Sequence, residues 1–341
     1  MRIWLGTWNC EMQYPSRQQF ITWLNHGSAG NADIIAIGLQ ESDRNGTITI
    51  NGFTKLTEIT VKGRTKAKSN RQVLMVFYRN NLGVQQHNID QRRVNLPTWK
   101  KKLKFWAEYG KGGAVAIVDF TPNLLVPATF WRIAICSAHL DSKDALSRQN
   151  QILEILNCAT NSCGGGRTWD LGFFMGDLNY RLTQGGVIGV GTTKAQLVTR
   201  FQTNLAGLFA QDGLNNSGDF ANWTFPDPCN GAPGQPLYLP TYKRLYKGAE
   251  GITAAGQAGN LPNGTSVEDC FHIPVEKHTN VVKLGERAGQ YDLGWLDRIG
   301  YRNRSMGVNL NVAHVRSGSL GTHADGVLSD HTPVYSVFDV T

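Results

Sequence analysis

One pattern repeats along the whole chain: a short run of apolar residues that ends on polar side chains. Segments with helical spacing lie between these runs, and one of them follows Ser16-Arg17-Gln18-Gln19, a capping box that predicts a helix start. Strands mixed with helices from end to end predict a layered α/β or α+β fold. The apolar runs lie at residues 3–8, 34–39, 73–78, 114–120, 130–136, 171–175, 291–299, 308–315 and 334–340.

Two further segments have helical spacing. Residues 143–158 and 193–209 each place apolar side chains on one stripe, which predicts a helix that packs on a sheet. No linker divides the chain, so residues 1–341 are predicted to form a single domain, with a long loop at residues 249–264. The stripe residues are Leu146, Leu153 and Leu156 in the first segment and Leu197, Phe201, Leu205 and Leu208 in the second.

Composition narrows the class of protein. With 341 residues and 41% hydrophobic content, the chain can bury a substantial core. No apolar stretch has the length of a membrane span, so we expect a cytoplasmic protein, at most peripheral to a membrane, with a secreted form left open. Six cysteines without a C-x-x-C pair argue against structural zinc, and disulfides Cys158–Cys163 and Cys229–Cys270 stay open.

Positive charge is concentrated in one segment. Residues 62–104 hold twelve basic side chains and one acidic side chain, a net +11; because the whole chain carries +8, the remainder carries −3. Such clustering favours an anionic partner, although a solvated face without a partner is the alternative. Within this segment, residues 98–106 interleave Trp99, Phe105 and Trp106 with four lysines, which predicts a peripheral contact with an anionic membrane.

The polar residues at the strand ends have the chemistry of a phosphate site. Residues 173–182 read FFMGDLNYRL, so an apolar strand delivers Asp177 and Asn179 to the rim of a sheet. Asp177 can take a proton from water, Asn179 can donate to a developing anion, and Arg181 has the fork geometry that suits phosphate. Capping of a turn by Asp and Asn is the alternative for this segment alone.

The ordered set of strand ends resembles the endonuclease/exonuclease/phosphatase superfamily and, within it, the inositol polyphosphate 5-phosphatases. The superfamily features are Asn9, Gln40-Glu41, His139, Gly176-Asp177-Leu178-Asn179, Asp297-Arg298 and Ser329-Asp330-His331. The narrower features are the segment 110–116, the string Gly-Asp-Leu-Asn-Tyr-Arg at 176–181, and Pro240-Thr241-Tyr242-Lys243. Two stretches, 293–296 and 141–144, depart from the family pattern and put substrate preference in doubt more than the reaction.

This resemblance implies a fold and a reaction. The fold is a four-layer sandwich of two mixed β-sheets flanked by helices. The reaction is Mg²⁺-dependent removal of the 5-phosphate from inositol polyphosphates or phosphoinositides.

The resemblance also implies roles for individual residues. Asp177, Asn179, His139, His331 and Asp297 would be catalytic; Asn9, Glu41 and, less firmly, Asp330 would hold Mg²⁺; Lys111, Arg181, Tyr242 and Lys243 would bind substrate, with the last two near a 4-phosphate.

Two other functions use the same residues. A nuclease or other phosphodiesterase of the superfamily would share the metal and the acid–base groups, but Pro240-Thr241-Tyr242-Lys243 argues against it and makes nucleic acid a disfavoured partner. A silent phosphoinositide-binding module would be expected to have lost Glu41, Asp177, Asn179 or His331, and all are present. The oligomeric state and the choice between lipid and soluble substrate stay open.

Overall fold

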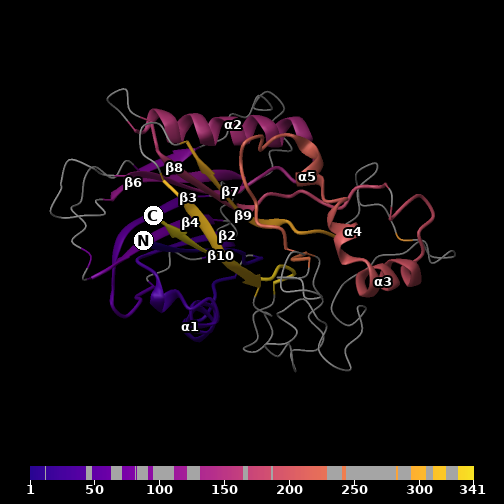
Figure 1. Cartoon of the computed structure of the whole chain (residues 1–341), viewed down its shortest axis with the longest axis horizontal. Coiled ribbons are helices and arrows are strands. Elements are labelled where there is room, and N and C mark those ends of the chain that lie inside the picture. The colour runs from indigo at the N-terminus through magenta and orange to yellow at the C-terminus, as the bar shows by residue number, and fades with distance from the viewer. Residues whose placement is uncertain are drawn as a thin grey trace.

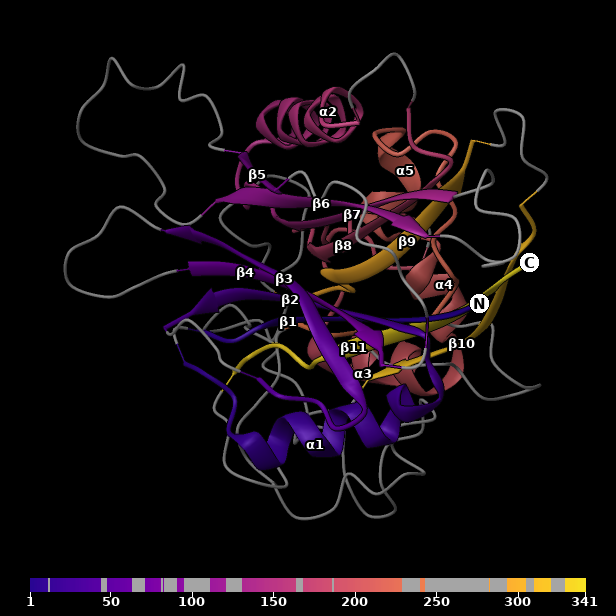
Figure 2. The same ribbon diagram turned by 90° about the vertical axis from the view of Figure 1, so that its left-hand side faces the viewer.

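A computed structural model describes residues 1–11, 13–43, 48–62, 71–80, 82, 91–94, 111–120, 131–163, 168–185, 187–228, 240–242, 282, 293–304, 310–319 and 329–341. Two mixed β-sheets face each other, with helices on the outside (Figures 1 and 2). This arrangement confirms the predicted sandwich of two mixed sheets flanked by helices.

The larger sheet has six strands in the order β10-β11-β1-β2-β4-β3. Strands β1 and β2 run parallel, and the other pairs are antiparallel. The strands are β1 (Arg2–Asn9), β2 (Ile34–Ser42), β3 (Phe53–Lys62), β4 (Arg71–Arg79), β10 (Val312–Ser319) and β11 (Val334–Val340).

The smaller sheet has five strands in the order β5-β6-β7-β8-β9. Here β7 and β8 are the parallel pair. The strands are β5 (Gln91–Val94), β6 (Gly112–Phe120), β7 (Trp131–His139), β8 (Leu171–Asp177) and β9 (Asp297–Asn303).

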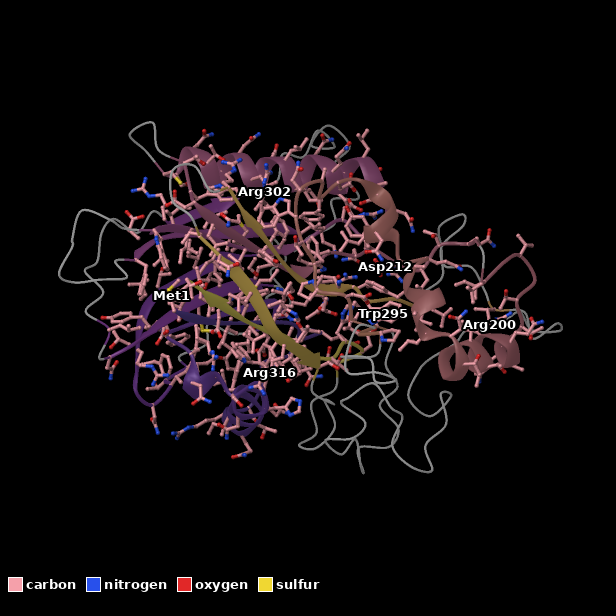
Figure 3. All side chains as sticks on the ribbon, in the orientation of Figure 1. Met1, Arg200, Asp212, Trp295, Arg302 and Arg316 are labelled. Carbon is pink, nitrogen blue, oxygen red and sulfur yellow. The ribbon has the colours of Figure 1, made fainter. Side chains whose placement is uncertain are left out.

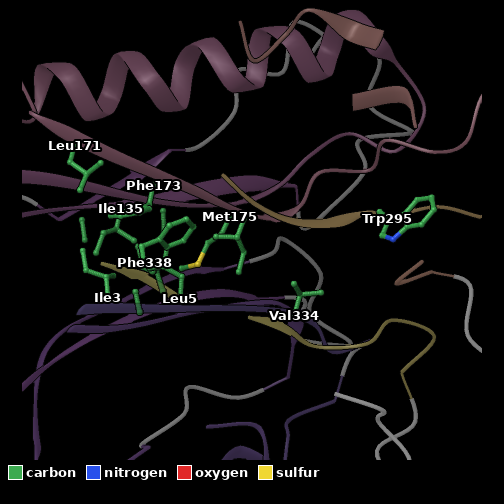
Figure 4. Close-up of a cluster of buried hydrophobic side chains, with 14 of the residues drawn as sticks. Ile3, Leu5, Ile135, Leu171, Phe173, Met175, Trp295, Val334 and Phe338 are labelled. Atoms are coloured by element: carbon green, nitrogen blue, oxygen red, sulfur yellow. The ribbon is translucent and has the colours of Figure 1, made fainter. Parts of the chain in front are cut away.

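Most central strands are apolar throughout because both of their faces are buried. In β1, Ile3 and Leu5 point between the sheets, while Trp4 and Trp8 point to the outer face. The inter-sheet core is continuous, and the rings of Phe173 and Phe338 meet across it with centroids 5.3 Å apart (Figure 4).

Helices cover the outer faces of the two sheets. The helix α1 (Arg17–His26) lies on the six-stranded sheet, and α2 (Ala145–Asn161) lies on the five-stranded sheet (Figure 2). The predicted capping box is present: the Ser16 hydroxyl accepts from the Gln19 backbone, and the Gln19 side chain accepts from the Ser16 backbone. The shorter helices are η1 (Ala29–Asn31), α3 (Lys194–Thr203), α4 (Leu205–Phe209) and α5 (Gly213–Ser217).

The helix predictions need two corrections. In α2, Leu146 and Leu153 are 60% and 52% exposed, because the buried stripe is formed by Ile152, Ile155 and Ala159. The predicted helix at 193–209 is two helices, because the Asn204 side chain accepts from the Gly207 backbone and caps a new start.

Several strand predictions were also shifted or missed. The run at 291–299 was expected to be a strand, but β9 begins at Asp297, since the backbones of Leu293 and Gly294 bond to Leu182 and Tyr242 instead. The run at 308–315 is shifted to 312–319, and β3 and β5 were not predicted at all. The predicted loop at 249–264 lies outside the described residues.

Two further expectations concern cysteines and membranes. Cys163 is a free thiol, as are Cys10 and Cys136, so the Cys158–Cys163 bridge does not form; Cys229 and Cys270 lie outside the described residues. Among the described helices, none is long and apolar enough to cross a membrane.

Candidate active site

The predicted site residues converge because their strands end at one rim of the two sheets. In the five-stranded sheet, His139 pairs with Asp177, and Asp177 pairs with Asp297. In the six-stranded sheet, Asn9 at the end of β1 pairs with Gln40 in β2. The residues that precede β11 complete this rim, because Val334 pairs with Thr7.

Asp177 is the centre of the site. Its Oδ2 accepts a hydrogen bond from Asn9 Nδ2 at 2.9 Å and lies 3.3 Å from His139 Nε2 and 4.0 Å from His331 Nε2. Its Oδ1 accepts from the Asn179 backbone N–H at 3.1 Å. One buried carboxylate thus joins donors from β1, from β7 and from the loop before β11.

His331 forms the second half of the site with Asp297. His331 Nδ1 lies 2.7 Å from Asp297 Oδ2, and both residues are buried. The loop that carries His331 is fastened to β1, since Ser329 Oγ donates to the Asn9 carbonyl at 2.6 Å and Trp8 Nε1 donates to the His331 carbonyl at 3.3 Å. His331 Nε2 therefore faces Asp177 while Nδ1 is held by Asp297.

The charges in this cluster stabilise one another. Burial disfavours the charged form of Asp177, but the hydrogen bond with His139 and the positive charges of His331, His139 and Lys111 outweigh it and hold the pKa below its usual range. Burial also works against charge on His331, yet Asp297 and Asp177 raise the pKa of His331 to about 10. Burial raises the pKa of Asp297, against the effect of His331.

Unusual backbone conformations occur at the ends of β2 and β8. Glu41 and Asn179 have φ of +49° and +57°, a region that non-glycine residues rarely adopt. Gly176, with φ of +144°, leaves no room for a side chain, since a Cβ there would lie 1.9 Å from the Ala138 carbonyl oxygen. Strain of this kind in two predicted site residues is typical of a functional site.

Asn179 and Glu41 also lie beside the cluster. The Asn179 carboxamide donates to the Leu140 carbonyl at 3.1 Å, so the Asn179 side chain lies against the residue that follows His139. Glu41 Oε1 lies 3.7 Å from His139 Nε2, and its side chain is about one quarter exposed.

Basic and aromatic side chains surround the cluster. Lys111 Nζ contacts His139 Nε2. The Tyr242 ring packs against His331 with centroids 4.7 Å apart, and the Arg181 guanidinium carbon lies 4.8 Å from the centre of the same ring. Lys243, the fourth predicted substrate-binding residue, lies outside the described residues.

Comparison with known proteins assigns the family. Residues 6–252 match the model of the Endonuclease/Exonuclease/phosphatase family 2. The chain belongs to this family. Membership assigns it to the hydrolases that act on phosphate esters. No curated protein sequence matches the chain at a significant level.

Several solved structures are similar to the chain, all at low sequence identity. The human Nocturnin catalytic domain with bound sulfate is 14% identical, with a TM-score of 0.47 over 100% of this chain and 94% of that one. The Bacteroides thetaiotaomicron mannosyl-6-phosphatase Bt3783 is 13% identical, with a TM-score of 0.49 over 99% of each chain. D. rerio TDP2 with a single-strand DNA product is 12% identical, with a TM-score of 0.45 over 99% of each chain. These likenesses are too distant to indicate a substrate.

The donor chemistry of the endonuclease/exonuclease/phosphatase site fits Mg²⁺. Members of the superfamily generally use divalent metal ions. Within the described ranges, no three His, Cys, Asp or Glu side chains group as a metal site. Mg²⁺ needs only one or two carboxylates because water and substrate phosphate complete its shell, and Glu41 supplies a partly exposed carboxylate.

The other two predicted metal ligands have different contacts. Asn9 uses its amide to donate to Asp177, and its Oδ1 accepts from the Glu11 backbone at 3.1 Å, so one lone pair of that oxygen remains for a metal. Asp330 Oδ1 lies 3.7 Å from His331 Nε2, which places this carboxylate beside the imidazole.

Two residues of the site were not predicted from the sequence. Thr241 Oγ1 accepts from the Asp297 backbone N–H at 3.1 Å, and Glu11 Oε2 accepts from the Asp330 backbone N–H at 3.1 Å. Thr241 lies within Pro240-Thr241-Tyr242-Lys243, one of the strings on which the resemblance rests, so the sequence contained a signal for this residue. Nothing in the sequence marks Glu11.

Proposed function

We propose that this family member is a Mg²⁺-dependent phosphate monoester hydrolase that removes the 5-phosphate from inositol polyphosphates, phosphoinositides or both. The observation that carries the proposal is the cluster around Asp177 Oδ2. There, one carboxylate lies among two imidazoles and an amide at a strand-end rim, with Lys111 in contact with His139. Donors that surround a carboxylate in this way suit a phosphoryl group attacked by water.

Each side chain in the cluster has a role that follows from its charge. Asp177 accepts a hydrogen bond from the attacking water and takes its proton late, when the forming bond to phosphorus has made the water more acidic, because a carboxylate with a lowered pKa is a weak base. His331 is protonated at neutral pH, so its Nε2–H donates to a phosphoryl oxygen while Asp297 holds Nδ1–H.

The remaining groups bind and neutralise phosphate. His139 and Asn179 would donate to phosphoryl oxygens, and Lys111 and Arg181 would supply positive charge at the rim. Bound Mg²⁺, held by Glu41 with Asn9 and Asp330 nearby, would neutralise charge on the phosphoryl oxygens and make water a better nucleophile.

The choice of the 5-phosphatase branch rests on sequence strings. Gly-Asp-Leu-Asn-Tyr-Arg at 176–181 and Pro240-Thr241-Tyr242-Lys243 support it, with Tyr242 and Lys243 at a neighbouring 4-phosphate. We also propose that residues 98–106, which lie outside the described residues, bring a cytoplasmic enzyme to anionic membranes.

One phosphate-release panel tests the proposal against its alternatives. Soluble inositol polyphosphates, phosphoinositide vesicles and an abasic DNA duplex are incubated with Mg²⁺ and either the native enzyme or Asp177→Asn. The expected result is free phosphate from the inositol compounds, reduced by roughly 10² or more in the variant. Cleavage of DNA without phosphate release would instead indicate a nuclease, and binding of phosphoinositide without turnover would indicate a silent module.

A further inference from the structure

Residues 240–242 lie between the segment that leads into Asp297 and the loop that carries His331. The backbone N–H groups of Thr241 and Tyr242 both donate to the Gly294 carbonyl at 3.1 Å, and the Gly294 N–H donates back to Tyr242 at 3.0 Å. On the other side, the Thr332 N–H donates to the Thr241 carbonyl at 3.1 Å. The short segment is thus bonded to the chain just before Asp297 and to the residue that follows His331.

The side chains of this segment contact the same pair. Thr241 is fully buried, and its hydroxyl accepts from the Asp297 backbone N–H at 3.1 Å. The Tyr242 ring lies against the His331 imidazole at 4.7 Å, with 40° between the ring planes. The Arg181 guanidinium lies over the same ring at 4.8 Å, so the chain segment that follows Asp177 also contacts Tyr242.

We propose that Thr241 and Tyr242 are positioning residues that orient the Asp297–His331 pair toward Asp177. The buried Thr241 hydroxyl accepts from the Asp297 backbone N–H and so holds the backbone from which the Asp297 carboxylate extends. Water competes little for a hydrogen bond in a buried position. An aromatic ring against the imidazole limits rotation of His331 and favours a cation at its face. This positioning role adds to the proposed function. It depends on that function only in the experiments that measure turnover.

The Thr241 hydroxyl is tested with an isosteric series. Thr241→Val removes the hydrogen bond without changing side-chain volume, and Thr241→Ser keeps it. We expect kcat to fall by about tenfold in the Val variant and to recover in the Ser variant, with KM changed less than twofold, because about 1.4 kcal/mol of orientation is lost. Thr57→Val is the matched control: Thr57 is buried in β3, away from the rim, and its hydroxyl has no hydrogen-bond partner among the described residues.

The Tyr242 ring is tested in the same assay. Tyr242→Leu removes the aromatic face, and Tyr242→Phe keeps it without the hydroxyl. We expect Phe to recover most of the kcat that Leu loses. If Phe and Leu lose equal activity, the hydroxyl acts directly on substrate and the ring does not position His331.

A second readout needs no substrate and separates this inference from the proposed function. The His331 Nδ1–H bonded to Asp297 gives a downfield proton resonance, identified by its loss in His331→Ala. We expect Thr241→Val and Tyr242→Leu to shift or broaden it, whereas Thr57→Val leaves it in place. An unshifted resonance in both variants, or an equal loss of kcat in Thr57→Val, would overturn the positioning role even if no inositol compound is hydrolysed.

Discussion

His331 Nδ1 lies 2.7 Å from Asp297 Oδ2, although the two residues are separated by 34 positions in the chain. Asp297 opens β9 in the five-stranded sheet, and His331 lies just before β11 in the six-stranded sheet. The contact therefore joins the two sheets at the rim where Asp177 lies. It keeps His331 charged, because Asp297 and Asp177 together outweigh the effect of burial and raise the pKa of His331.

Loss of the Asp297 charge should be as damaging as loss of His331 itself. We expect Asp297→Asn to lower kcat by roughly 10² or more, since the imidazole then loses both its charge partner and its orientation. In a double-mutant cycle with His331→Ala, the second change should add little, because the two residues act as a unit.

Asp119→Asn is the control: Asp119 is also buried, pairs with Arg132 at 2.7 Å and lies in β6 away from the site. Additive losses would show that the pair does not act together.

Activity should depend on a divalent cation held through Glu41. We expect full loss of turnover in excess EDTA, recovery with Mg²⁺, and a higher Mg²⁺ requirement with lower rate in Glu41→Gln, because an amide is a weaker ligand for a hard cation. Glu58→Gln is the matched control, since Glu58 lies on β3 and pairs with Lys55 at 2.6 Å. Undiminished turnover in EDTA would rule out the metal.

Asp212 should make stability depend on pH. It is fully buried, with Oδ1 3.4 Å from Arg298 Nη1, at the end of the sheets near Trp295 and α4 (Figure 3). Burial outweighs Arg298 and raises the pKa of Asp212 to about 6. The folded state then binds this proton more tightly than the unfolded chain, so the stability that Asp212 contributes is largest below about pH 4 and decreases up to about pH 6.

Asp212→Asn removes this titration. Relative to the native protein, the free energy of unfolding of the variant should therefore rise by roughly 2 kcal/mol between pH 4 and pH 7, as measured by urea denaturation at both values. Contributions from other carboxylates cancel in the comparison. A difference between the two proteins that does not change with pH would contradict the raised pKa.

The basic segment should determine membrane binding without affecting chemistry. We expect Lys100, Lys101 and Lys102 changed together to Ser to weaken binding to anionic vesicles by about 10²-fold, at about 1 kcal/mol per lysine, and to slow lipid hydrolysis. Hydrolysis of a soluble inositol phosphate should be unaffected. A charge-matched control changes Lys55, Lys143 and Lys194, which lie at three other positions. Unchanged sedimentation with vesicles, or equal loss on both substrates, would exclude a docking role.

The strands that could be predicted are those with a recognisable pattern in their own residues. Runs such as residues 34–39 and 171–175 are buried on both faces, so they are apolar throughout and their type is plain from sequence. Strand β3 was missed because it lies at an edge of the sheet, where exposed positions such as Thr54 and Lys55 interrupt the apolar pattern. The apolar residues 293–296 were assigned to a strand because composition cannot show that their backbone bonds to other loops.

The sequence indicated which residues belong to the candidate site but not which residues they contact. Polar residues at strand ends indicated Asp177, His139 and Asp297, because the ends of neighbouring strands meet at one rim. The contacts of Thr241 and Glu11 depend on how separate loops pack, and one sequence carries no such information. Likewise, the stripe in α2 was assigned to Leu146, Leu153 and Leu156. Packing on β6 and β7 instead buries Ile152 and Ile155, and of the predicted residues only Leu156 is partly buried against them.

The position of the phosphate removed is the most direct test of the account. Inositol 1,4,5-trisphosphate is incubated with the native protein and Mg²⁺, and the product is identified by ³¹P NMR, with Asp177→Asn as the inactive control. The account predicts a single product, inositol 1,4-bisphosphate, together with one equivalent of inorganic phosphate. Loss of the 1- or 4-phosphate, or an intact trisphosphate in a preparation that cleaves the DNA backbone, would contradict it.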